Sequence, residues 1–130
     1  MHKNFLLAGS VLGAVAVVLG AFGAHGLKQV VPAETVQTFQ TGVQYQMYHA
    51  IALLITGILY ERFSNKLIKL AGSFFIIGIL LFSGSLYLLT LLKATEAVGL
   101  SKIGIITPVG GLCFILGWLS LFAGMLKKDH

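Results

Sequence analysis

Three stretches of this 130-residue chain are long, strongly apolar and free of charge. They cover residues 5–24, 70–92 and 103–126. A helix rises about 1.5 Å per residue and the hydrocarbon core of a bilayer is about 30 Å thick, so about 20 apolar residues suffice to cross it. The sequence therefore predicts three membrane-spanning helices in these stretches.

The composition argues against a water-soluble fold. Charged residues make up 10% of the chain, whereas soluble domains carry charge on about a quarter of their residues. Basic residues outnumber acidic ones by nine to four, but they are scattered between the apolar stretches instead of being gathered on one face, as in nucleic-acid binders. We expect membrane lipid to cover this protein and expect no nucleic-acid partner.

A fourth span is expected at residues 44–60, although its strongly apolar part, residues 47–59, is too short to cross alone. Apolar residues continue upstream at helical spacings of three or four. They are Val36, Phe39, Val43, Met47, Ala50 and Leu54. We therefore expect one helix from Pro32 to Tyr60, with residues 32–43 as an amphipathic extension on the outer side and Pro32 as its first helical residue.

The first stretch admits a second interpretation as a cleaved signal peptide. Lys3 precedes the apolar run, and Ala21-Phe22-Gly23 loosely resembles a small-residue cleavage site. The run is longer than the core of a typical signal peptide, so we expect residues 5–25 to be retained as a span.

The last stretch contains Pro108, which is compatible with two structures. Pro108 kinks a helix that began near Ile103, or Thr107 caps a helix that starts at Pro108. The second structure leaves residues 101–106 irregular, which is tolerated at membrane depth only where the backbone lines a cavity or is buried in protein. We favour the kinked helix.

The basic residues predict the orientation. With four spans, both termini and the middle loop share one side of the membrane. That side holds Lys3, Arg62, Lys66, Lys69, Lys127 and Lys128, and the other holds Lys28, Lys93 and Lys102. By the positive-inside rule, we expect an all-α, up-down-up-down bundle of four transmembrane helices in the inner or plasma membrane, with both termini cytoplasmic. We expect a single membrane domain over residues 1–130.

Polar side chains inside a bilayer are costly, so they mark function or helix packing. In this topology they are expected in the outer half of the bundle. The candidate polar cluster comprises His25, Gln44, Tyr45, Tyr48, His49, Ser83, Ser85, Tyr87 and Thr107. At 100° per residue, the four cluster members on the second helix share one face, whereas Gln46, which is also polar, points elsewhere.

His25 and His49 raise the possibility of a shared site, since antiparallel neighbouring helices would place both rings at similar depth. Zinc normally takes three or four ligands, the spans contain no carboxylate, and Cys113 stands alone. We therefore expect no metal and no cofactor. The favoured interpretation is that each histidine bonds a carbonyl or a tyrosine and fixes helix register, with a proton, ion or solute role as the alternative.

Small residues on the first helix predict a close-packing face. Gly9 and Gly13 form a GxxxG pair that Gly20 continues, and such spacing lets helix backbones approach in lipid. The pattern leaves open whether this face packs inside the monomer or between copies.

Signatures of catalysis are absent from the sequence: it has no glycine-rich phosphate loop followed by lysine, no nucleophile elbow and no paired carboxylates within the spans. We expect no enzymatic activity.

Two motifs carry a family resemblance. They are Gly20-Ala21-Phe22-Gly23-Ala24-His25-Gly26-Leu27 and Tyr45-Gln46-Met47-Tyr48-His49-Ala50. Together with residues 82–87 and 107–111 they resemble the small membrane proteins catalogued as the domain of unknown function 423 family, also called uncharacterised protein family 0382. The resemblance covers nearly the whole chain. It implies a multi-span inner-membrane protein without a settled activity, and it adds weight to His25 and His49.

We expect a structural or accessory role, in which the chain packs with itself or with another membrane protein. The alternative is a small oligomeric transporter or channel for protons, ions or a small solute. The alternative predicts His25, Tyr48, His49 and Ser85 around a hydrated cavity. The accessory role predicts a satisfied polar cluster and an exposed face of small residues.

Overall fold

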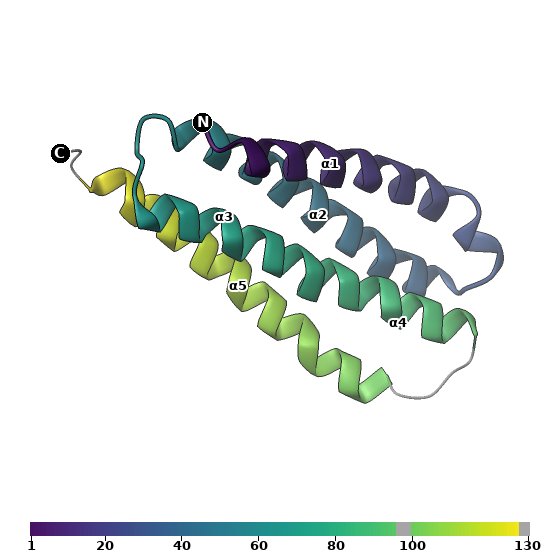
Figure 1. Ribbon diagram of the computed structural model, residues 1–130. Helices are drawn as coiled ribbons and strands as arrows, with labels where there is room; N and C mark the ends of the chain where they lie inside the picture. Colours follow the sequence, from purple (N-terminus) through teal and green to yellow (C-terminus); the bar gives the residue numbers. More distant parts are fainter. Residues whose placement is uncertain (96–99, 128–130) are drawn as a thin grey trace.

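Four helical rods alternate in direction along the bundle (Figure 1). The computed structural model describes residues 1–95 and 100–127, and the side chains of all of these except 100–102; the basic side chains of Lys102 and Lys128 lie outside this description. The helices are α1 (Lys3–Ala24), α2 (Ala33–Leu59), α3 (Lys66–Gly78), the π-helical η2 (Ile79–Ser83), α4 (Gly84–Ala94) and α5 (Leu100–Leu126), with a 3-10 turn η1 (Leu27–Gln29). The prediction of an all-α fold with four helical rods is confirmed.

Three of the rods are long and apolar enough to cross a membrane, namely Lys3–Gln29, Lys66–Ala94 and Ile103–Leu126. The second of these contains α3, η2 and α4 without a break. The more polar α2 is not among these three, but its 27 residues give it a length of about 40 Å at 1.5 Å per residue, which exceeds the thickness of the hydrocarbon core. Pro32 is the N-cap of α2 and not its first helical residue, a shift of one position from the expectation.

Side-chain caps fix where α1 and α3 begin. Asn65 precedes α3, and its Oδ1 accepts from the backbone N–H groups of Leu67 and Ile68 at 3.0 and 3.2 Å. Its Nδ2 donates to the carbonyl of Gly124 at 3.0 Å, which also ties the start of α3 to the end of α5. His2 caps α1 by accepting from the N–H of Phe5 at 3.3 Å.

A seam with seven-residue spacing joins α1 to α2. On α1 it consists of Phe5, Gly9, Leu12, Ala16, Leu19 and Gly23, and on α2 of Phe39, Val43, Gln46, Ala50, Leu53 and Gly57; all of these are buried or half-buried. A methyl group added at Gly9 would lie 2.9 Å from the carbonyl oxygen of Ala50, and one at Gly23 would lie 2.9 Å from the ring of Phe39. The seven-residue repeat is typical of helices packed at a shallow angle.

A second seam joins the third rod to α5 by alternating large and small side chains. Gly110, Gly117 and Gly124 of α5 lie seven residues apart and face Phe82, Phe75 and Ile68, which also lie seven apart. At one position the sizes are reversed: the large residue, Phe114, is on α5 and the glycine, Gly78, is on α3. Close backbone approach at these glycines replaces the hydrophobic driving force that helices lack in lipid.

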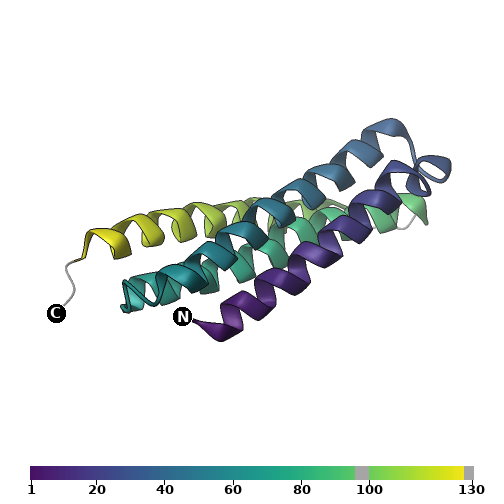
Figure 2. The same cartoon turned by 90° about the horizontal axis from the view of Figure 1, so that it is seen from above.

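The two seams divide the bundle into two hairpins. Helix α1 packs mainly on α2, and α5 packs mainly on α3 and η2. As a result α1 and α5 lie at opposite edges, with α2 and the α3–α4 rod between them (Figures 1 and 2). Both termini and the loop between α2 and α3 gather at one end of the molecule.

The glycines singled out on α1 have different surroundings. Gly9 contacts α2 closely, and a methyl group at Gly20 would lie 3.4 Å from Val43. At Gly13 an added methyl group would meet nothing within 4 Å. Gly9 and Gly20 therefore serve packing within the monomer, whereas Gly13 faces open space.

Pro108 lies inside the continuous helix α5. The alternative in which Thr107 caps a new helix at Pro108 is therefore wrong. The physical reason is that α5 contacts the third rod on both sides of the proline. Gly110 lies against Phe82, and Thr107 pairs with Ser85, so the backbone is held helical across Pro108.

Candidate functional site

The side chain of Gln46 links three helices at the centre of the bundle. Its Nε2 donates to the carbonyl of Leu12 on α1 at 2.8 Å, and its Oε1 accepts from the hydroxyl of Tyr87 on α4 at 2.6 Å. A second glutamine, Gln40, makes the same kind of contact closer to the end opposite the termini, by donating to the carbonyl of Gly20 at 3.3 Å. In an apolar surrounding such bonds fix the register of neighbouring helices.

The π-helical segment places a serine against α2. Ser83 is completely buried, and its hydroxyl donates to the carbonyl of Gly42 at 2.6 Å. Gly42 has no side chain, which lets the ring of Tyr87 approach: a methyl group there would lie 3.0 Å from it. Single π turns inside α-helices are frequently found at functional sites. Here Phe82 contacts Gly110 of α5, while the next residue, Ser83, bonds α2.

Ser85 and Thr107 pair across the seam between α4 and α5. Their hydroxyl oxygens lie 2.6 Å apart, and the Ser85 hydroxyl also lies 2.8 Å from the carbonyl of Phe82. Each hydroxyl can donate one hydrogen bond and accept others, so this short chain satisfies both groups. Thr107 thus bonds a neighbouring helix instead of capping its own.

His49 stands between the two hairpins, near the middle of the bundle. Its Nδ1 lies 2.7 Å from the carbonyl of Tyr45, and the indole N–H of Trp118 donates to its Nε2 at 3.1 Å. A carbonyl only accepts and an indole only donates, so Nδ1 carries the proton and the ring is neutral. The ring also stacks on Phe114 with centroids 3.6 Å apart.

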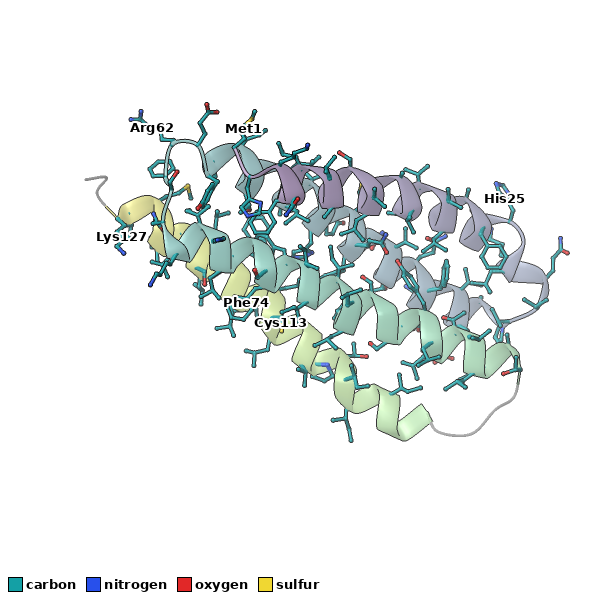
Figure 3. The ribbon with its side chains drawn as sticks, viewed as in Figure 1. Met1, His25, Arg62, Phe74, Cys113 and Lys127 are labelled. Atoms are coloured by element: carbon teal, nitrogen blue, oxygen red, sulfur yellow. The ribbon has the colours of Figure 1, made fainter. Side chains whose placement is uncertain are left out.

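His25 does not join His49. It is the exposed C-cap of α1 and lies at the end of the bundle opposite the termini, pointing away from it (Figure 3). The expectation of similar depth is wrong, because Gln46 pairs with Leu12 and His25 follows Leu12 by 13 residues, about 20 Å along the helix. The same register places His49 near the middle of the bundle and not in its outer half.

The remaining candidates on α2 lie on the outside. Tyr45 and Tyr48 are 38% and 55% exposed, with ring centroids 5.7 Å apart, and Gln44 is also exposed. Tyr45 flanks the His49 ring at 6.1 Å. As predicted, Gln46 points to another side of α2.

The polar residues thus divide into three sets. A polar lattice joins the helices and consists of Gln46, Ser83, Ser85, Tyr87 and Thr107. An aromatic group surrounds His49, and the remaining candidates are exposed. Within the described part of the chain, no buried side-chain nitrogen or oxygen lacks a hydrogen-bond partner. The same residues contain no group of three histidine, cysteine, aspartate or glutamate side chains able to hold a metal. This arrangement is suited to holding helices in register, since the side chains of Gln46, Ser83 and Tyr87, and the Ser85–Thr107 pair, are bonded to neighbouring helices.

Sequence reasoning missed the partners of His49 and the glycines of α5. Trp118 and Phe114 were not singled out because aromatic residues in an apolar span carry no distinct signal. The seven-residue spacing of Gly110, Gly117 and Gly124 was a usable signal, and it matches the spacing of Gly9, Ala16 and Gly23 on α1.

Comparison with known proteins identifies the family. The profile described as "Protein of unknown function (DUF423)" matches residues 19–111. The UPF0382 membrane protein YwdK of Bacillus subtilis (strain 168) is 40% identical over 126 residues, covering 96% of this chain and 98% of its own length. No solved structure matches the chain significantly.

Two further relatives cover the chain almost completely. A UPF0382 membrane protein of Haemophilus influenzae is 43% identical over 128 residues, or 98% of each chain. The UPF0382 inner membrane protein YgdD of Escherichia coli (strain K12) is 34% identical over 98% of this chain and 93% of its own. With three helical rods apolar enough to span a bilayer, this chain is a membrane protein that belongs to the DUF423 family.

Proposed function

We propose that this protein is a multi-pass component of the inner or plasma membrane, with both termini cytoplasmic, and that its role is structural or accessory and not enzymatic. The observation that carries the proposal is that the polar lattice and His49 are already bonded. A conduction or catalytic site needs polar groups free for a substrate, and here Gln46, Ser83, Tyr87 and His49 are bonded to neighbouring helices. The name of the E. coli relative supports the choice of membrane.

An accessory role requires a surface that contacts a partner, and α1 has an exposed face of small residues. Ser10, Ala14 and Ala21 are exposed, and Gly13 beside them has open space around it. Small residues on a lipid-facing helix let a partner backbone approach closely. We propose that α1 packs through this face against a second copy or another membrane protein.

Cysteine cross-linking in intact membranes tests the surface. In a Cys113→Ala background, Ala14→Cys is expected to form a disulfide dimer or to cross-link to a neighbouring membrane protein. Leu119→Cys on the lipid-facing side of α5 is the matched control and is expected to stay monomeric. Equal cross-linking at both positions, or none at Ala14, contradicts a specific contact on this face.

Flux measurements separate the accessory role from transport. Proteoliposomes loaded with a pH-sensitive dye are expected to leak protons at the rate of empty vesicles, because the described bundle has no buried polar group left for a permeant. The His49→Ala variant is expected to behave the same way. Proton flux that depends on this protein and disappears in His49→Ala supports the transporter alternative instead.

A further inference from the structure

The exposed side of α2 is more polar than a lipid-facing surface should be. Its exposed residues form one stripe in which neighbours lie three, four or seven positions apart. The stripe, called here the outward face of α2, consists of Gln37, Gln44, Tyr48, Ile51, Ile55 and Ile58. It is turned away from α1, because Gln46 bonds α1 and Gln44 lies about 200° from Gln46 around the axis at 100° per residue.

Gln44 lies near the middle of the membrane. It is two residues, about 3 Å along the helix, from Gln46, whose amide bonds Leu12 of α1. Leu12 is close to the centre of the charge-free residues 5–24, and Glu34, the only charged residue of α2, is about 15 Å away. That distance is about half the thickness of the hydrocarbon core. In a lone copy the exposed amide of Gln44 therefore faces lipid tails, which neither donate nor accept hydrogen bonds.

The exposed side of α5 has the composition expected of a lipid-facing surface. Its exposed residues Val109, Leu112, Ile115, Leu119 and Phe122 are all apolar. On α2 the situation differs: within the described part of the chain, the hydrogen bonds to α1 take up Gln40 and Gln46 but not Gln44. Helix α2 is also not among the three rods apolar enough to cross a membrane. These observations indicate that a protein surface, and not lipid, covers the outward face of α2.

We propose that two copies of this chain pair through the outward face of α2, with their Gln44 amides bonded to each other near the middle of the bilayer. Copies inserted in the same orientation are related by a two-fold axis along the membrane normal, which places both Gln44 side chains at one depth. A primary amide donates and accepts, so each amide complements the other.

The rest of the face suits the same partner. Ile51, Ile55 and Ile58 continue the stripe toward the end that holds the termini, and such an apolar stripe packs against its own copy. A single polar residue within an apolar helix contact fixes the register and the number of copies. This contact uses α2 and not α1, so it is separate from the α1 surface proposed above.

Disulfide cross-linking in native membranes tests the pairing. Two full-length forms with different epitope tags, both carrying Cys113→Ala and Ile51→Cys, are co-expressed and treated with an oxidant. We expect the two tagged forms to be linked to each other. Leu119→Cys is the control at similar depth, because its neighbour Trp118 bonds His49, and it is expected to stay monomeric. Equal linking at both positions, no link at Ile51→Cys, or a link to a different protein instead overturns the proposal.

Substitutions on the same face test the amide pair. In the Ile51→Cys background, Gln44→Leu is expected to lower the cross-linked fraction at least threefold. Gln37→Leu makes the same change about 10 Å farther along α2, beside Glu34, and is expected to leave that fraction within twofold. Cross-linking that survives Gln44→Leu, or falls equally in Gln37→Leu, overturns the assignment of Gln44.

Two measurements keep these outcomes distinct from other failures. Unchanged Trp118 fluorescence in purified Gln44→Leu shows that the bundle is intact, since this side chain points away from the helices of its own copy. Cross-linking through Ala14→Cys reads the α1 surface separately, so either contact can fail without the other.

Discussion

Gln46 holds α1, α2 and α4 in one register through a single amide. Gln46→Leu removes the acceptor of the Tyr87 hydroxyl and the donor to Leu12 in a place that water does not reach. We expect the free energy of unfolding to fall by about 1–2 kcal/mol, the range that model studies give for such bonds in membranes. Reversible unfolding in mixed detergent micelles, followed by helical circular dichroism, measures the change.

Tyr87→Phe supplies the matched control, because it removes the same hydroxyl bond from the other side. In the double variant the losses should be smaller than the sum of the single losses, by about 0.6 kcal/mol, the average coupling found for such pairs. Additive losses would mean that the bond between Tyr87 and Gln46 contributes nothing and that Gln46 acts through its bond to Leu12 and through packing.

The bond between Trp118 and His49 can be observed directly, because Trp118 is the only tryptophan of the chain. A hydrogen bond to an indole N–H lowers the energy of its emission. We therefore expect His49→Phe, which preserves an aromatic ring over Phe114 but offers no acceptor, to shift the fluorescence maximum to shorter wavelength. His25→Ala, at the exposed end of α1, should leave the spectrum unchanged. An unchanged spectrum in His49→Phe contradicts the bond.

At the scale of helices, α5 contains two glycines that test whether close approach stabilises the second seam. Gly110 lies against the backbone of Phe82, whereas Gly104 faces open space. Gly110→Ala is expected to lower the free energy of unfolding by about 1–3 kcal/mol through overpacking. Gly104→Ala is expected to be neutral or slightly stabilising, since alanine favours helix over glycine by about 1 kcal/mol. Equal effects in the same unfolding assay contradict the seam.

The extent of each helix could be predicted from the sequence, because bilayer thickness and helical periodicity act locally. Pro32 and Tyr60 are the residues that flank α2, as the spacing of its apolar residues indicated. The inward faces could not be predicted the same way. In lipid, both sides of a helix are apolar, so Gly9 and Gly13 look alike in sequence although only Gly9 contacts α2.

The membership of the site was predictable only in part, because Gln46, which links three helices, was left out of the expected cluster. Ser83, Ser85, Tyr87 and Thr107 were singled out as costly polar groups, and each has a partner on another helix or a neighbouring turn. The position of His49 relative to His25 depended on the register between α1 and α2. That register is set by Gln46 and by close contacts at glycines. The seven-residue spacing marks which residues of α1 form such contacts, but not which residues of α2 they meet. The π-helical segment was likewise unpredicted.

For the molecule as a whole, both termini and the α2–α3 loop lie at one end, so a single orientation determines the side on which every loop lies. The excess of basic residues at that end favours the cytoplasm. In a Cys113→Ala background, a membrane-impermeant maleimide added to spheroplasts is therefore expected to label Lys28→Cys, in η1, and not Arg62→Cys, in the α2–α3 loop. Both positions should react once the membrane is permeabilised. Labelling of Arg62→Cys alone in intact spheroplasts reverses the orientation.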